Sequence, residues 1–217
     1  MSVIRFINDQ NRGIDSLHKI IRYVTREGRI KNELQKGIGI FSDDSFEEMK
    51  FMRKMFHAEA GKMYQHLVVS NSAMLKDPAI AHQIAMRIAS FYGNEYQVLV
   101  CTHTDTENLH SHLVINTINV LEGKRLSQNK NDLEKLRNFA NGIFAEYGLP
   151  LIGENDIFFV EYDECEETDP YYELCKESEV LEEEYEIIRP IKFLNYEEEA
   201  KELREFQMRM ESYKEGS

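Results

Sequence analysis

Two apolar segments separated by a short polar loop constrain the fold of this chain more than any other feature. Residues 96–103, "YQVLVCTH", and residues 110–120, "HSHLVINTINV", are rich in the β-branched and aromatic side chains that favour strands. The connection between them contains "TDTEN", which is too short for the helix that a parallel crossover requires. We therefore expect an antiparallel hairpin.

The rest of the first 150 residues alternates between helical and strand-like patterns. Apolar side chains at helical spacing predict helices at residues 14–25, 45–57, 76–93 and 130–148. Ser45 is the expected N-cap of the second helix, with Glu48 completing a capping box, and Asp77 is the expected N-cap of the third. Further strands are predicted at residues 2–7 and 62–70, and a loop at residues 26–40. The resulting order predicts an α+β fold, with a mainly antiparallel central sheet and helices packed against it.

Charge divides the chain into two parts. Residues 1–150 carry 19 Lys and Arg against 17 Asp and Glu, whereas residues 151–217 carry 7 against 22. The formal net charge of −13 therefore comes from the last third, and the first part is free to form local basic patches. We predict one folded domain at residues 1–152 and an acidic, partly helical C-terminal extension at residues 153–217.

Cysteine content and hydropathy indicate the compartment. Cys101, Cys165 and Cys175 are odd in number and match no zinc-binding spacing, which favours a reducing environment over a disulfide framework. No apolar run approaches the roughly 20 residues that a membrane span requires, and the N-terminus has no signal-peptide core. We expect a cytoplasmic protein that does not contact a membrane.

Three histidines gather at the predicted hairpin. His110 and His112 are two residues apart in a strand, so their side chains project from the same face, and His103 ends the partner strand about 5 Å away. Three imidazoles that converge in this way form a candidate metal site with open coordination positions. Such a site is suited either to activating water or to polarising a phosphate that a protein side chain attacks. The second reading is weakly favoured, because Asp105 is the only nearby candidate for a general base.

The segment "HTDTENLHSHLVIN" resembles the HUH signature of conjugative relaxases, which is H-x-D-x(4)-H-x-H followed by an apolar strand. "LHKIIRYVTREGRI" is similar to the N-terminal motif of the relaxase and mobilisation nuclease family (MobP-like HUH endonucleases), and "YQHLVVS" to its second strand. "GKRLSQNKNDLEKLRNFANGIFAEYGLPLI" resembles a later stretch, so the resemblance covers roughly residues 1–152.

The resemblance implies Tyr23 as the nucleophile, Asp105 as an acid oriented towards the site, and three metal ligands: His103, His110 and His112. The implied cofactor is a divalent metal ion, manganese or magnesium, with zinc as the alternative. The implied activity is nicking of single-stranded DNA at an origin of transfer through a 5′-phosphotyrosine intermediate. Accessory relaxosome and coupling proteins are the implied partners. His66, central in "YQHLVVS", is expected either beside this site or in a purely structural role.

Basic residues in two segments are candidates for contacts with DNA phosphates. They follow the tyrosine helix or the histidine strand: Arg22, Arg26, Arg29, Lys124, Arg125 and Lys130. Other functions remain open at this point. One is a rolling-circle replication initiator, and another is a metal-dependent DNA-binding module without cleavage. A metallophosphoesterase that releases its product by hydrolysis would form no covalent adduct.

Overall fold

The computed structural model describes residues 2–8, 13–26, 32–93, 95–105, 109–153 and 157–161. One sheet has the strand order β2-β4-β5-β3-β1-β6. Its strands are β1 Val3–Asn8, β2 Gln35–Ile38, β3 Tyr64–Ser70, β4 Val98–His103, β5 His110–Asn116 and β6 Ile157–Glu161. The helices are α1 Ile14–Val24, α2 Ser45–Met55, α3 Pro78–Ala89 and α4 Lys130–Glu146, with a 3₁₀ turn η1 at Asn32–Leu34.

Every strand pair is antiparallel except β1 with β6. This arrangement confirms the predicted α+β fold with a mainly antiparallel sheet. The expected hairpin is also confirmed, because β4 and β5 pair from Val98 with Ile115 to His103 with His110.

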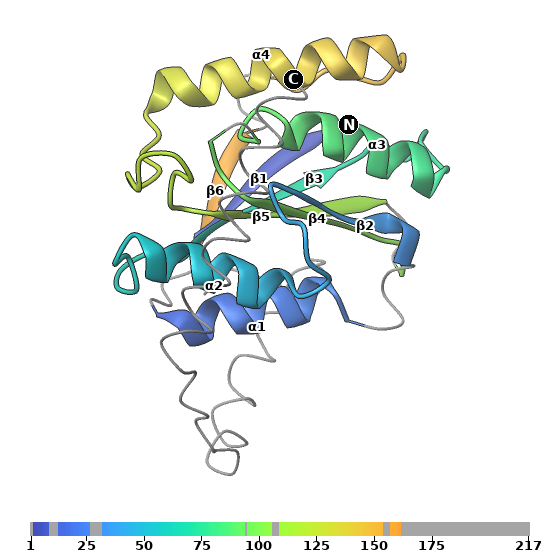
Figure 1. Ribbon diagram of the computed structural model, residues 1–217. Helices are drawn as coiled ribbons and strands as arrows, with labels where there is room; N and C mark the ends of the chain where they lie inside the picture. The colour runs from blue at the N-terminus through green and yellow to red at the C-terminus, as the bar shows by residue number, and fades with distance from the viewer. Residues whose placement is uncertain are drawn as a thin grey trace, which may run out of the picture. The chain divides into compact units, whose positions relative to one another are not determined.

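Helices cover both faces of the sheet (Figure 1). Leu113 and Ile115 of β5 face one side, in a core completed by α3 and α4. Val114 faces the other side with Leu99 of β4, in a core that contains residues of α1 and α2. Since side chains alternate along a strand, His110 and His112 share the face of Val114 and lie on the α1 side.

Two helix starts test the predicted caps. The Asp77 carboxylate accepts hydrogen bonds from the first-turn amides of α3, as predicted. The predicted capping box at Ser45 is wrong, because Asp44 caps α2 by accepting from the Glu47 amide at 3.0 Å. Glu48 instead turns back and accepts from the Ser42 amide at 2.7 Å and from the Phe41 amide. Asp44 succeeds because it stands one residue earlier, where its carboxylate reaches the N3 amide.

Two strands were not expected from the sequence. The loop predicted at residues 26–40 contains η1 and β2, and β2 pairs with β4 from Gln35 with Cys101 to Ile38 with Val98. "QKGI" has no apolar alternation, so this edge strand forms through pairing rather than through a propensity of its own. β6 lies within the predicted extension and pairs with β1. Residues 162–217 lie outside the described residues, and the boundary at residue 152 stays a prediction.

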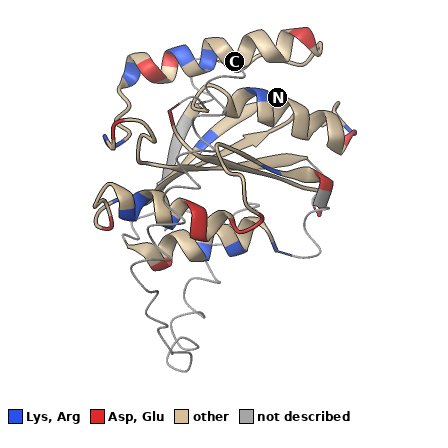
Figure 2. Cartoon of the chain, viewed as in Figure 1, with Lys and Arg blue, Asp and Glu red and all other residues tan. Residues whose placement is uncertain are grey.

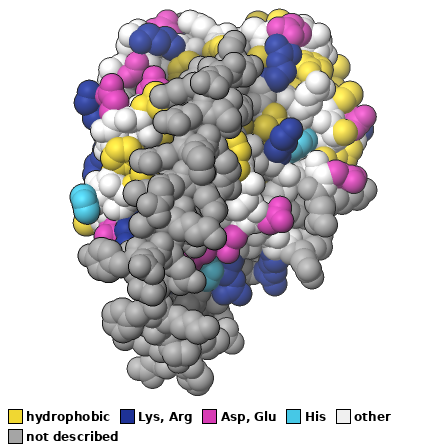
Figure 3. Space-filling view, viewed as in Figure 1, with side chains coloured by type: hydrophobic (Ala, Val, Ile, Leu, Met, Phe, Trp, Pro, Cys, Tyr) yellow, Lys and Arg dark blue, Asp and Glu magenta, His cyan; other side chains and the backbone are white. Residues whose placement is uncertain are grey.

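Charged residues lie mainly on the helices and loops, while the strands between the helices carry few (Figure 2). On the face drawn in Figure 3, the described basic side chains are interspersed with acidic ones rather than gathered into one patch. Within the described ranges, no helix has the length and apolar character to cross a membrane.

Candidate active site

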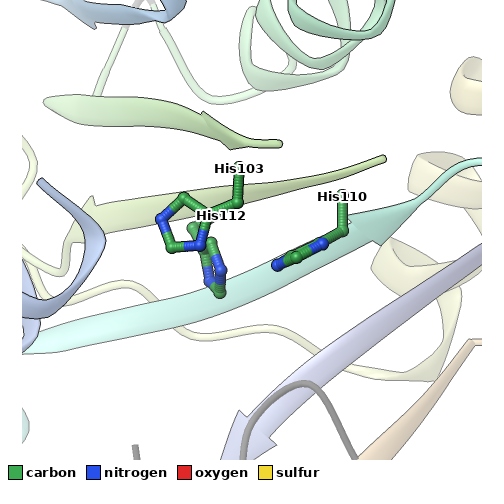
Figure 4. Close-up of side chains that lie close together, drawn as sticks. All are labelled: His103, His110 and His112. Carbon is green, nitrogen blue, oxygen red and sulfur yellow. The ribbon is translucent and has the colours of Figure 1, made fainter. Parts of the chain in front are cut away.

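Three imidazole rings converge at the loop end of the β4–β5 hairpin, where β4 ends and β5 begins. His103 pairs with His110 across the two strands, and His112 follows on the same face. The ring centroids of His103 and His112 are 4.3 Å apart, and that of His110 lies 5.2 Å from the first and 5.1 Å from the second (Figure 4). All three rings are buried, and one nitrogen from each lies within 4.8 Å of the others. This is the spacing that a shared cation requires.

Hydrogen bonds determine which nitrogens face this point. His103 Nε2 lies 3.0 Å from the carbonyl oxygen of Val24, at the end of α1. A carbonyl only accepts, so Nε2 carries the proton and the lone pair of neutral His103 is on Nδ1. Outer partners that orient a ring in this way are typical of metal-binding histidines. The donor set therefore fits a divalent metal ion.

His66 is the outer partner of His112. Its Nε2 lies 2.9 Å from His112 Nδ1, and the two rings stack with centroids 5.1 Å apart. Burial, and then the nearby charge of His103, lower the pKa of His66 to about 3, so its ring is neutral at physiological pH. For His112 to offer the lone pair of Nε2 to a metal ion, its Nδ1 must carry the proton, and His66 Nε2 is then the acceptor of that proton. His66 therefore lies beside the site, in contact with a candidate ligand.

Tyr23 lies against the same histidines. Its ring centroid is 5.7 Å from that of His112, in an edge-on arrangement, and 6.1 Å from that of His103. Tyr23 is 4% exposed, because Ile20, Ile21 and Val24 pack α1 onto the sheet around it. The bond from His103 to the Val24 carbonyl holds the residue next to Tyr23, so a candidate ligand and the helix of the candidate nucleophile are directly connected.

The other candidates near the tyrosine lie at the surface. Asp105 is exposed, two residues beyond His103, and both Arg22 on α1 and Arg26 beyond its end are exposed. Arg29 lies outside the described residues. The exposed arginines therefore mark the end of α1 that carries Tyr23.

The second basic group lies elsewhere. Lys124 and Arg125 follow β5, and Lys130 begins α4. The histidines stand at the start of β5, so a strand length of about 20 Å separates the two groups. Lys124 forms an exposed ion pair with Glu122 at 2.7 Å. These residues do not line the histidine site.

Sequence reasoning left two features of the site undecided or unseen. The role of His66 depends on strand order, because β3 becomes the neighbour of β5 only in the folded sheet. The contact between His103 and the Val24 carbonyl joins residues 79 positions apart. For His66, the one available sequence signal was the alternation of side chains along "YQHLVVS", which puts His66 on the face opposite Leu67.

The mainly antiparallel sheet, with three buried histidines beside a tyrosine on a covering helix, is the arrangement that the sequence motifs predicted. Residues 23–149 match the family described as relaxase, MobA/VirD2-like, nuclease domain. The chain belongs to this family, and the predicted family membership is confirmed.

The chain is similar to curated proteins and to a solved structure. Protein rlx of Staphylococcus aureus is 27% identical over 136 residues, which are 63% of this chain and 40% of that protein. The group II intron-interrupted relaxase LtrB of Lactococcus lactis subsp. cremoris is 27% identical over 137 residues, 55% of this chain and 24% of that protein. The chain thus spans less than half the length of these curated relatives. A solved structure titled "Molecular Basis of Vancomycin Resistance Transfer in Staphylococcus aureus" aligns with a TM-score of 0.44 and 12% identity, over 72% of this chain and 96% of that one.

Proposed function

We propose that this domain nicks one strand of DNA at an origin of transfer by transesterification onto Tyr23. The observation that carries the proposal is the contact between the Tyr23 ring and the rings of His112 and His103. The Tyr23 ring thus contacts two of the three candidate ligands. The family match adds support, because its description is that of a relaxase nuclease domain.

His103, His110 and His112 would hold a divalent metal ion, manganese or magnesium, with zinc as the alternative. When bound, the ion supplies positive charge to the non-bridging phosphate oxygens. His66 and the Val24 carbonyl orient two of the three rings, so these protein groups preset the site before DNA arrives.

The reaction conserves the number of phosphoester bonds. The Tyr23 oxygen forms a bond to phosphorus, and the bond from phosphorus to the 3′ oxygen breaks. The departing 3′ oxygen takes up one proton, in exchange for the one that leaves the tyrosine, and becomes a free 3′-hydroxyl. The 5′ phosphate on the other side of the break is then attached to Tyr23. A phenol has a pKa near 10, so its proton must pass to an acceptor, a role we give to Asp105. Because one phosphoester replaces another, the step is reversible, and the same site can rejoin the strand.

The substrate in this proposal is single-stranded DNA, and the accessory relaxosome and coupling proteins are its partners, in the cytoplasm. Arg22 and Arg26 are exposed near the nucleophile and are suited to contacting phosphates as the strand enters. Arg29 and the three basic residues after β5 remain candidates for contacts further along the strand. The near-neutral charge of residues 1–150 makes such local contacts more important than overall attraction.

The test is a covalent-adduct assay. Wild type, Tyr23→Phe and Tyr64→Phe are incubated with a single-stranded origin oligonucleotide and manganese, and are separated on a denaturing gel. Tyr64 is the matched control, because it is equally buried at 4% and packs on the same face of the sheet. We expect a DNA–protein band in wild type and Tyr64→Phe, but none in Tyr23→Phe or with chelator. A band that persists in Tyr23→Phe would exclude Tyr23 as the nucleophile. Product without any band would indicate hydrolysis, and DNA binding without product a module that does not cleave.

A further inference from the structure

A second cluster of positive charge lies at the end of β5 opposite the three histidines. A cavity of about 340 Å³ opens there, between the turn before β3 and the hairpin that follows β5. Its lining residues are Ala60, Gly61, Lys62, Thr117, Arg125 and Leu126. None of these residues lines the histidine site, and Arg125 alone among them was a general candidate for DNA contact.

A buried arginine of α2 adjoins the wall of this cavity. Arg53 is 0% exposed and donates to Thr117 Oγ1 at 3.2 Å and to the Lys62 carbonyl at 3.2 Å. Its other partners, the Met63 carbonyl at 2.7 Å and Asn116 Oδ1 at 2.9 Å, are also neutral. Burying a charge is costly unless an opposite charge offsets it. These hydrogen bonds engage both terminal nitrogens of Arg53, but among the described residues its buried Nε has no hydrogen-bond partner and its charge has no counterion.

The charge of Arg125 adds to that of Arg53. Burial first, and then repulsion from Arg125, lower the pKa of Arg53 to about 10, and no carboxylate contributes to raising it. Arg53 therefore remains charged at neutral pH. Among the residues that the structure describes, neither arginine forms an ion pair with a carboxylate. Two like charges thus lie close together at the cavity.

Arg125 is held at the cavity by the turn opposite it. Its guanidinium donates to the Ala60 carbonyl at 2.5 Å and to the Lys62 carbonyl at 3.4 Å, so Arg53 and Arg125 reach the same Lys62 oxygen. Gly61 has a φ of +77°, and a Cβ at this position would lie 3.3 Å from Arg125 Nη1. The turn therefore takes a conformation that favours glycine and leaves room for the guanidinium. Arg125 remains exposed to solvent, whereas Arg53 is not.

We propose that this cavity binds a backbone phosphate of the DNA strand, with Arg125 contacting the phosphate oxygens and Arg53 supplying charge from the interior. A guanidinium matches phosphate geometry through paired N–H donors, and a bound phosphate offsets the charge that the two arginines leave uncompensated. The choice of DNA as the source of the phosphate rests on the proposed function. By strand rise, the cavity lies about 24 Å along β5 from His110. In a strand with stacked bases the phosphates are about 3.4 Å apart along the axis, so this distance spans about seven phosphates.

The experiment measures binding rather than cleavage. The affinity for fluorescein-labelled oligothymidylate is followed by anisotropy over a salt series, in the Tyr23→Phe background with EDTA, so failure of the nicking chemistry does not affect the result. Arg125→Gln is compared with Arg125→Lys and with Arg87→Gln. Arg87 is the charge-matched control, because it lies on α3 and pairs with Glu146. Far-UV circular dichroism and thermal melting establish that each variant is folded.

We expect Arg125→Gln to weaken binding about ten-fold at low salt. It should also reduce the slope of log K against log salt by about 0.7, the value for one phosphate contact on a single strand. Arg125→Lys keeps the charge and should keep the slope, and Arg87→Gln should match the parent. An unchanged slope in Arg125→Gln would overturn the proposal. Calorimetric titration with inorganic phosphate separates DNA from a free anion as the source of the phosphate. Binding heat that depends on Arg125, together with an unchanged slope of log K against log salt for DNA, would identify a free-anion site and refute the DNA assignment.

Discussion

Removing the outer partner of His112 tests whether the three histidines form a preset metal site. In His66→Leu, the buried Nδ1 of His112 loses the hydrogen-bond partner that lies 2.9 Å away. The loss of such an outer partner typically costs ten- to hundred-fold in metal affinity. This range corresponds to about 1.4 to 2.8 kcal/mol, which matches the cost of leaving one buried donor unsatisfied. We therefore expect manganese affinity to fall by that factor while the three candidate ligands stay in place.

The assay is isothermal titration of manganese into the metal-free protein. His82→Leu is the matched control, because His82 is also a buried histidine, but it bonds Thr102 on the opposite face of the sheet. His66→Gln keeps an acceptor and should recover part of the lost affinity. Equal affinities in His66→Leu and wild type would refute the inference that His66 orients His112. An equal loss in His82→Leu would point instead to a general loss of stability.

Two further predictions concern stability. Asp77→Ala removes the carboxylate that caps α3, and the free energy of unfolding in urea should fall by about 1 kcal/mol; an unchanged midpoint would mean that the cap contributes nothing. Burial first, and then the charge of Lys36, lower the pKa of His82 below its ordinary 6.5. As the pH falls through about 6.5, the His82 ring therefore takes up a proton in the unfolded chain but not in the folded one. The contribution of His82 to the free energy of unfolding is fully present above that pH. Below it, this contribution falls by up to about 1.4 kcal/mol per pH unit. Unfolding followed from pH 7 to pH 5 should show a weaker pH dependence in His82→Gln than in wild type, and an equal pH dependence in the two proteins would contradict this prediction.

The sequence alone determined the features that arise within short segments. Alternation and β-branched residues predicted the β4–β5 hairpin, and with it the common face of His110 and His112. Asp77 and Pro78 predicted the start of α3, because a cap acts on amides within its own first turn. The motifs around Tyr23 and the histidines predicted the family that the comparison then confirmed. Each of these signals depends on neighbours a few residues apart.

Only the tertiary structure decided the features that join distant segments. β2 has a weak pattern of its own and forms because β4 offers an edge to pair with, whereas β6 has strand-favouring residues but takes its place in the sheet only by pairing with β1. His66 contacts His112 across 46 positions, and the Val24 carbonyl reaches His103 across 79. In the sequence, Arg53 has the pattern of an ordinary surface residue on an amphipathic helix. In the folded chain it is buried and donates to neutral hydrogen-bond acceptors from distant segments. The physical reason is that strand order and helix docking are set by the burial of the whole apolar surface, which no local pattern encodes.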